Sequence, residues 1–409
     1  MRLLNTSTLE LHYALSATGT GRRPYAILSH TWEDEEILFD DVKNGPQAIP
    51  RHKKGFSKVE GSARYAKEQG LDWIWIDTCC IDKSSSAELS EAINSMFIWY
   101  HSARVCFAYL SDVKSPEELA SSRWFKRGWT LQELIAPREV EILDSQWQLM
   151  GDRTGMANTL SSITGIDELL LAGHYTIDAY SVSTRMGWAS RRETGREEDM
   201  AYSLLGIFQV NLPLLYGEGL TRAFFRLQEE ILKTSSDQSI FAFRRFLEGP
   251  SSNLLRNMAR HLAISPTQFQ QDDTIINDDP YERSYAALHP ITLHPHGVTF
   301  RALIGPATYH LNKQTSINTQ LVILNCCFQS DPLARPAFLV ANLDGLLVRV
   351  STPVLRAVQV PVPGEGSVSA IEVGINHPEG HQAWLEQMNL RGERCSPGHS
   401  FSLESRLTP

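Results

Sequence analysis

The sequence predicts an α/β fold built on a mainly parallel, doubly wound sheet with helices on both faces. Two apolar runs, YAILSHTW (residues 25–32) and LDWIWIDTCCID (residues 71–82), have the continuous hydrophobicity of strands that are covered on both sides. Segments with helical periodicity alternate with these runs, and this alternation is typical of βαβ units. Ligands in such sheets bind at the carboxyl ends of the strands, so the residues that follow each run are the candidates for a site.

The first predicted helix spans residues 58–69. Val59, Ala63 and Ala66 follow the helical period, and Gly70 supplies the stop signal. The second predicted helix follows the run at residues 71–82. It begins near Ser85, which has Glu88 three residues later, as in a capping box.

Two further strands complete the predicted sheet, at residues 104–110 and 139–143. Between them lies the aromatic and basic segment SRWFKRGWTLQELIAP (residues 122–137), which enters a short helix that Pro137 ends. Glu133 lies in this helix.

The remaining sequence changes character twice. Residues 151–243 have mostly helical periodicity, in five candidate helices: 156–163, 166–172, 180–189, 197–207 and 219–234. Short β-branched runs separated by Pro, Gly and Asn follow at residues 296–304, 319–328, 336–343, 345–351 and 354–363. We therefore expect an α/β domain at residues 1–150, a helical segment at 151–243 and a β-rich module at 244–409.

Composition and charge exclude several classes of function. The net charge of −9 and the pI near 5.8 give no basic field for nucleic acid, so we expect no nucleic-acid partner. The N-terminus does not resemble a secretory signal, and no run approaches the ~20 apolar residues of a membrane span. Six cysteines without CxxC spacing predict reduced thiols and no metal site, which indicates a cytoplasmic protein.

The motifs resemble those of a known family. YAILSHTW, GLDWIWIDTCCIDK, SEAINSMFIWYHSARVCFAYLSDV and SRWFKRGWTLQELIAP occur in the order found in the fungal heterokaryon-incompatibility (HET) domain. GREEDMAYSLLGIFQVNLPLLYGEG resembles the segment that commonly follows it, so the resemblance covers residues 1–243. It implies a protein that triggers cell death when genetically different hyphae fuse, with a TIR-like (flavodoxin-like) domain.

The resemblance to TIR domains also implies site residues. W-T-L-Q-E-L is similar to the W-C-L-x-E-L motif whose glutamate cleaves nicotinamide from NAD, which assigns catalysis to Glu133 and places Trp129 beside it. LSHTWEDEE is similar to L-S-F-R-G-E-D, which places Ser29, His30 and Trp32 near the same pocket.

The chemistry of this reaction suits one carboxylate. Breaking the nicotinamide–ribose bond builds oxocarbenium-like charge, and nicotinamide is a good leaving group, so Glu133 alone could stabilise that charge. Asp77 and Asp82 could bind ribose. The diphosphate could be neutralised by Arg127, Lys126 or Arg123, and a base could stack on Trp32, Trp129 or Trp124. NAD would be a substrate, and no cofactor is expected; GxGxxG and P-loop motifs are absent from the sequence.

Each of these residues also has a structural interpretation. Glu133 could be a carboxylate favoured by the helix dipole or a partner of Arg127, Asp77 could cap a loop, and His30 could be a hydrogen-bonded structural histidine. His30, Cys79 or Cys80 and Asp77 could instead form a thiol-nucleophile site. The sequence favours a buried core position for Trp124 and Phe125, and a solvated linker for the charged residues 190–199.

Three interpretations of function follow. The first is a cell-death effector that hydrolyses NAD when it assembles into a homo-oligomer under an unidentified protein trigger. The second is a non-enzymatic scaffold that makes homotypic contacts through the HET domain. The third is an accessory protein of a secondary-metabolism locus.

Overall fold

The structure is a computed structural model, which describes thirteen segments of the chain. They are residues 1–13, 23–244, 262–270, 273–276, 291–294, 297–301, 303–310, 316–324, 326–331, 334–343, 346–349, 355–357 and 400–404. Most of the run predicted at residues 354–363 lies outside them. Contacts divide the chain into two compact units: Met1–Ala179 with Arg192–Gly219, and Tyr180–Arg191 with Leu220–Pro409. The domain boundaries expected at residues 150 and 243 stay predictions.

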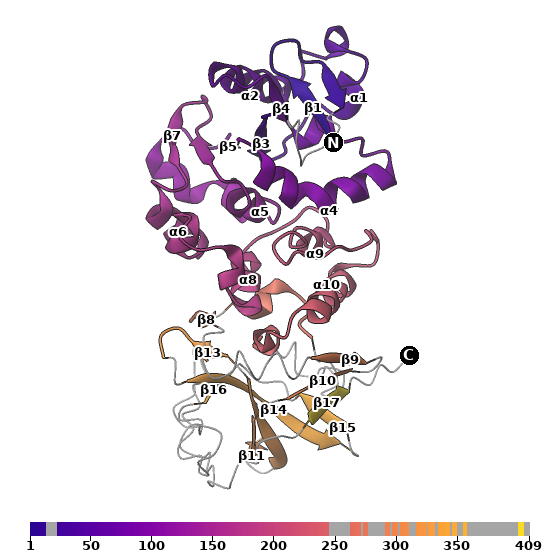
Figure 1. Ribbon diagram of the computed structural model, residues 1–409, viewed down its shortest axis with the longest axis vertical. Helices are drawn as coiled ribbons and strands as arrows, with labels where there is room; N and C mark the ends of the chain where they lie inside the picture. The colour runs from indigo at the N-terminus through magenta and orange to yellow at the C-terminus, as the bar shows by residue number, and fades with distance from the viewer. Residues whose placement is uncertain are drawn as a thin grey trace. The chain divides into compact units, whose positions relative to one another are not determined.

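The first unit is an α/β structure around a seven-stranded mixed sheet with the strand order β2-β1-β4-β3-β5-β6-β7 (Figure 1). Its strands are β1 (Arg2–Asn5), β2 (Leu11–Tyr13), β3 (Ala26–His30), β4 (Trp73–Trp75), β5 (Val105–Tyr109), β6 (Val140–Leu143) and β7 (Leu149–Asp152). The four central strands β4, β3, β5 and β6 pair in parallel, and β1, β2 and β7 add antiparallel edges. The predicted parallel centre is therefore confirmed, and the edge strands are additions to it.

Helices of the first unit surround the sheet. The α-helices are α1 (Phe39–Val42), α2 (Phe56–Glu68), α3 (Asp77–Cys80), α4 (Ser86–Ser102), α5 (Thr130–Ile135), α6 (Ala157–Thr164), α7 (Glu168–Leu171) and α9 (Asp199–Tyr202). Short 3-10 turns lie at Pro46–Ala48, Pro116–Ser121, Arg123–Lys126 and Ile177–Ala179. Ser85 caps α4 by accepting a hydrogen bond from the Glu88 backbone, which confirms the predicted start of this helix.

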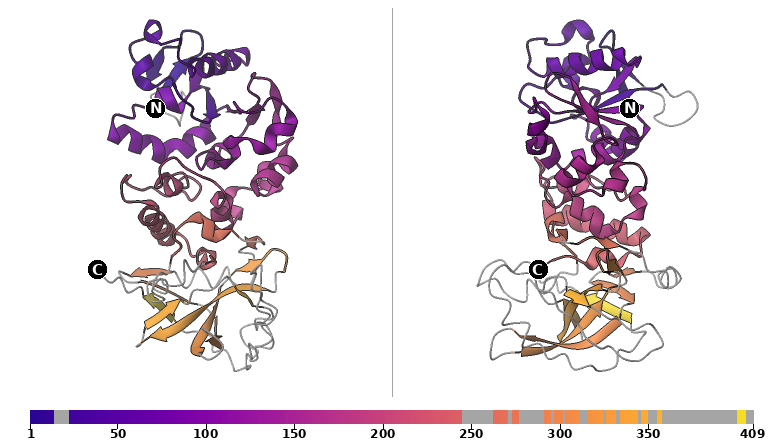
Figure 2. Two further views of the ribbon diagram at one scale, coloured as in Figure 1. Left: turned by 180° about the vertical axis from the view of Figure 1, so that it is seen from behind. Right: turned by 90° about the vertical axis from the view of Figure 1, so that its left-hand side faces the viewer.

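Successive residues of β5 contact helices on opposite faces of the sheet, as the two-residue period of a strand requires. The Cys106 thiol points to α5 and donates to the Glu133 carbonyl at 3.7 Å, while the Phe107 ring packs edge-on against Tyr65 of α2 at 5.0 Å. Figures 1 and 2 show helices on both sides of this sheet. All five residues of β3 and of β5 are buried, which explains their continuous apolar sequences.

The order of the parallel strands determines where a ligand would bind. From β3 the chain crosses to β4 on one side, and it then returns past β3 to β5 and β6 on the other. The strand order therefore reverses beside β3, and the carboxyl end of β3 next to β5 is a topological switch point. Ser29 and His30 occupy this end.

The second unit combines helices with an eight-stranded sheet. Seven of its strands follow the order β11-β12-β14-β15-β17-β10-β9, and the eighth, β16, pairs with β14. Its helices are α8 (Val182–Ala189) and α10 (Leu220–Thr234), with 3-10 turns at Gln238–Phe241 and Pro266–Phe269. Its strands are β8 (Ile275–Ile276), β9 (Thr292–His294), β10 (Gly297–Arg301), β11 (Leu303–His310), β12 (Ser316–Ile323), β13 (Cys327–Phe328), β14 (Arg335–Leu343), β15 (Leu346–Arg349), β16 (Leu355–Ala357) and β17 (Ser400–Glu404). β8 and β13 form a separate pair.

One predicted helix is shorter than expected. The helix predicted at residues 197–207 is only one turn long, because α9 ends at Tyr202 and turns follow it. The strands β1 and β2 were not predicted from the sequence. Within the described segments, every helix is too short or too polar to cross a bilayer.

Candidate active site at the carboxyl edge of the parallel strands

Glu133 lies inside the first unit and bonds to the end of β3. Its side chain projects from α5, only 7% of its surface is exposed, and it accepts a hydrogen bond from the Ser29 hydroxyl. The indole Nε1 of Trp124, which can only donate, bonds to Ser29 Oγ at 2.8 Å. Because the serine oxygen accepts from Trp124, its own proton is directed to Glu133.

Burial changes the acidity of Glu133. Loss of hydration raises the pKa of its carboxyl from 4.5 to about 7, and the nearby charge of Asp77 adds to the rise. Hydrogen bonds from Ser29 and Tyr100 and the positive charge of Arg127 oppose it. Glu133 is therefore a carboxyl group that can change its protonation state near neutral pH, as functional carboxyls often do.

Two buried arginines hold the ends of α5, the helix that carries Glu133. At its start, Arg192 Nη1 donates at 2.9 Å both to Thr130 Oγ1 and to the Arg127 carbonyl. At its end, Arg153 donates to the carbonyls of Leu134, Ile135, Pro137 and Arg138, at 2.8–3.2 Å. These carbonyls lie at the end of the helix, where intrahelical donors run out, so both arginines position Glu133.

The burial of Arg192 overturns the expectation that residues 190–199 are a solvated linker. Arg192 is 5% exposed, and burial lowers the pKa of its guanidinium to about 10. The backbone of its neighbour Glu193 pairs with the segment before α5. The Glu193 N–H donates to the Lys126 carbonyl, and the Glu193 carbonyl accepts from the Gly128 N–H. The sequence of a charged run gives no signal of such burial. Arg192 is buried because acceptors far away in the sequence need a hydrogen-bond donor.

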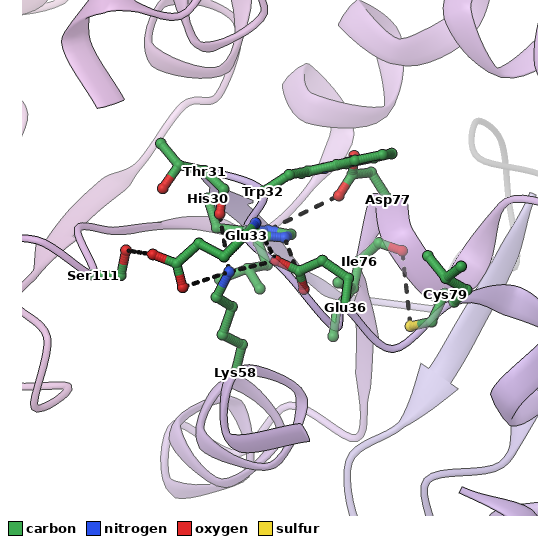
Figure 3. Close-up of polar contacts among 12 residues, drawn as sticks. His30, Thr31, Trp32, Glu33, Glu36, Lys58, Ile76, Asp77, Cys79 and Ser111 are labelled. Atoms are coloured by element: carbon green, nitrogen blue, oxygen red, sulfur yellow. Dashed lines mark hydrogen bonds and ion pairs between the residues drawn. The ribbon is translucent and has the colours of Figure 1, made fainter. Parts of the chain in front are cut away.

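His30 lies beside two carboxylates without a hydrogen bond to either. Its Nε2 is 3.9 Å from Glu36 and its Nδ1 is 3.9 Å from Asp77, as Figure 3 shows. The side chain is buried, and both ring nitrogens lack hydrogen-bond partners. Burial lowers the pKa of His30, although Asp77 and Glu36 oppose this, so the ring is neutral in the fold. It is therefore not the hydrogen-bonded histidine of the structural interpretation.

A buried lysine holds the loop that follows β3. Lys58 of α2 donates to the Thr31 carbonyl at 3.0 Å and forms ion pairs with Glu36 and with Glu33, the latter at 3.3 Å (Figure 3). Glu33 also accepts from Ser111, at 2.8 Å, and from Arg123, at 3.0 Å. Arg123, a candidate for the diphosphate in the sequence, is thus engaged by a carboxylate of this loop.

Trp32 and Asp77 meet above the ends of β3 and β4. The indole Nε1 donates to Asp77 Oδ2 at 2.8 Å, and Lys83 Nζ lies 3.4 Å from the centroid of the Trp32 ring. Trp32 remains 38% exposed, which is unusual for so large an aromatic residue. Asp77 therefore orients Trp32. Lys83 is a residue of this group to which the sequence assigned no role.

The remaining predicted site residues divide between two places. Arg127 acts electrostatically on Glu133 and on His30, so it belongs to the same group as Ser29. Trp129 donates from Nε1 to Asp199 of α9 at 3.3 Å. The structure thus brings Ser29, Glu133 and Arg127 together, whereas the indole of Trp129 bonds outside this group.

In the alternative site based on thiols, Cys79 is not an activated nucleophile. Cys79 and Cys80 are buried, and a hydrogen bond with Cys80 together with burial raises the pKa of the Cys79 thiol. A thiol nucleophile needs the opposite shift. Trp124 and Phe125, in contrast, are buried as the sequence predicted, and Trp124 has a further role as the donor to Ser29.

Comparisons with known proteins support part of the resemblance. Residues 25–120 match the family described as heterokaryon incompatibility protein (HET), and residues 222–332 match a domain of unknown function, DUF8212. The vegetative incompatibility protein HET-E-1 of Podospora anserina is 48% identical over 223 residues, 51% of this chain. The chain covers only 16% of that relative.

No solved structure matches the chain. Glu133 lies beyond the end of the HET match, so its role does not follow from that match. The similarity to heterokaryon incompatibility proteins inferred from the motifs is supported for residues 25–120.

Proposed function

We propose that the chain is a cell-death effector of heterokaryon incompatibility whose first unit hydrolyses NAD through Glu133. The observation that carries the proposal is the Ser29–Glu133 hydrogen bond at the switch point of the parallel sheet. The similarity of residues 25–120 to heterokaryon incompatibility proteins supports the biological role. The order β4-β3-β5-β6 is that of the first four strands of a flavodoxin-like sheet, which supports the TIR-like assignment.

The chemistry assigned to Glu133 is stabilisation of a cationic sugar. When the C–N bond to nicotinamide breaks, its electron pair leaves with nicotinamide, and water then adds to the ribose carbon to give ADP-ribose and a proton. An ionised Glu133 would stabilise the positive charge on ribose in a site that excludes water. Ser29 would orient the carboxylate by donating to one oxygen and leaving the other for the substrate.

The test is release of nicotinamide from NAD by the purified full chain at high concentration. We expect turnover in the wild type and its loss in Glu133→Gln, which preserves the size of the side chain and removes its charge. Glu60→Gln is the matched control, because Glu60 lies exposed on α2. Equal turnover in wild type and Glu133→Gln would reject the catalytic assignment.

Gating by assembly is part of the proposal. We expect a homo-oligomer to form through the HET domain after a protein trigger, so the assay includes the chain fused to an oligomerising tag. Activity that appears only in the fused protein supports gating. Equal activity per chain in both forms would argue against it.

A scaffold without enzymatic activity is the second candidate, and the burial of Glu133 favours it. A carboxyl group that is 7% exposed and bonded to Ser29 could serve only to join α5 to β3. Under this interpretation, Glu133→Gln retains cell killing in fungal cells, and neither form releases nicotinamide. Loss of killing together with loss of turnover would reject the scaffold.

A further inference from the structure

We propose that Lys83 and Arg127, together with Trp32, form a subsite for the phosphate groups of a nucleotide beside Glu133. This inference rests on the proposed function, which it deepens by assigning residues to the anionic part of the substrate. Lys83 is the last residue of the motif GLDWIWIDTCCIDK, and the sequence assigned it no role.

Lys83 has a buried ammonium group without a hydrogen bond. Its Nζ is inaccessible to solvent and has no hydrogen-bond partner, and its distance to Asp77 Oδ2 is 4.0 Å, the limit of an ion pair. Burial lowers the pKa of Lys83, and the charge of Asp77 opposes that shift. An ammonium group offers three donors, and here its neighbours are the face of Trp32, 3.4 Å from the ring centroid, and the Asp77 carboxylate, neither of which accepts a hydrogen bond from it. This cation therefore has unused capacity to bind an anion.

Arg127 supplies a second cation with the same property. Its Nε is buried and lacks a hydrogen-bond partner. The positive charge of Arg127 acts to lower the pKa of His30, of Lys83 and of Glu133, so Arg127 lies within electrostatic range of all three groups. Both cations therefore belong to one site and have donors to spare.

The location of these groups is that of a ligand site in a parallel sheet. His30 and Trp32 end β3 and begin its loop, Asp77 and Lys83 follow β4, and Arg127 lies after β5 and before α5. His30 is 5% exposed and its ring makes no hydrogen bond, and its Nδ1 lies 3.9 Å from Asp77. Separate segments thus bring unsatisfied polar groups to the carboxyl edge of the sheet, where ligands collect.

A phosphate group fits these donors better than a neutral ligand does. Its oxygens would accept charge-assisted hydrogen bonds from the ammonium and, in bidentate form, from the guanidinium. Asp77 does not satisfy the ammonium group, because its Oδ2 lies 4.0 Å from Lys83 Nζ, beyond hydrogen-bond distance. A nucleoside without phosphate would leave both cations unsatisfied and would bind more weakly.

The experiment measures binding by isothermal titration to the full chain carrying Glu133→Gln, which removes turnover as a complication. The probes are ADP-ribose, adenosine and inorganic pyrophosphate. Lys83→Met is added to remove the charge while keeping the length of the side chain, Lys83→Arg keeps the charge, and Lys67→Met is the control because Lys67 lies exposed on α2.

We expect Lys83→Met to weaken ADP-ribose binding at least about tenfold relative to Lys67→Met, since a hydrogen bond from a charged group contributes about that factor. Lys83→Arg should retain most of the affinity, and adenosine affinity should not change. Pyrophosphate binding as tight as that of ADP-ribose would support the subsite and identify a free anion as its ligand.

Three results would overturn the subsite: equal ADP-ribose affinity in Lys83→Met and Lys67→Met, an equal loss of adenosine and ADP-ribose affinity, or no binding of either anion before Lys83 is changed. These three results differ from the result that would reject the proposed NAD hydrolysis. Binding that depends on Lys83 in a chain whose wild type releases no nicotinamide would support the subsite and reject the hydrolase.

Discussion

Ser29 and Glu133 are 104 positions apart in the chain, yet the serine hydroxyl donates directly to the buried carboxylate. The bond joins the carboxyl end of β3 to α5, and Trp124 completes it by donating to Ser29 Oγ. Glu133 therefore has a defined orientation and a defined donor. Four predictions follow from this arrangement and from the groups around it.

Ser29→Ala should impair Glu133 without removing it. The variant leaves the Trp124 indole without an acceptor and Glu133 without a donor that lowers its pKa, so we expect a loss of about 1–3 kcal/mol in stability. The pKa that limits NAD turnover should move upward. Urea unfolding and a pH profile of nicotinamide release measure the two effects, with Ser7→Ala on the surface as control. An unchanged pH profile would show that Ser29 does not control the ionisation of Glu133.

The stability of the protein should depend on pH through Glu133. Its pKa is about 7 in the fold and 4.5 as the ordinary value, so the folded state holds the proton more tightly. The resulting stabilisation is complete below about pH 4.5 and is lost as the pH rises through 7, a total of about 3 kcal/mol. The free energy of unfolding of wild type minus that of Glu133→Gln should thus fall between pH 4.5 and pH 8. A difference that does not vary with pH would mean that Glu133 has an ordinary pKa.

Arg192→Met should lower NAD turnover further than the loss of folded protein alone would lower it. The variant removes the donors to Thr130 and to the Arg127 carbonyl, so the turn before Glu133 loses its support. We expect a cost of about 1.5–3 kcal/mol in stability and a fall in kcat with little change in KM. Arg64→Met is the control, since Arg64 is exposed and pairs with Glu68 at the surface. A rise in KM at constant kcat would indicate that Arg192 binds substrate instead.

Arg153→Met should destabilise the first unit strongly. The Arg153 guanidinium donates to the last carbonyls of α5 and to the Leu171 carbonyl at 3.2 Å, so its removal leaves several buried acceptors unsatisfied. We expect a loss of at least about 3 kcal/mol in the free energy of unfolding. Arg104→Met, which removes an exposed pair with Glu139, should cost less than about 1 kcal/mol. Similar midpoints of urea unfolding for the two variants would contradict the capping role of Arg153.

The central strands and the main helices of the first unit are predictable from local sequence patterns. A parallel strand that is buried on both faces needs a continuous apolar run, and a helix needs its period and caps, and both signals are local. The Ser85 cap, the strand at residues 25–32 and the burial of Trp124 were therefore predictable. The motif that contains Glu133 identified the residue, although no local signal could show its burial.

The groups that surround Glu133 are brought there by long-range contacts, which local sequence patterns do not show. Arg192 lies in a charged segment that resembles solvated surface, and it is buried because distant segments meet it. The ammonium group of Lys83 is inaccessible to solvent for the same reason. The pairing of β1 with β4 depends likewise on a partner about 70 residues away, beyond any local pattern. Contacts of this kind arise from the order of strands in the sheet, and that order is a property of the whole fold.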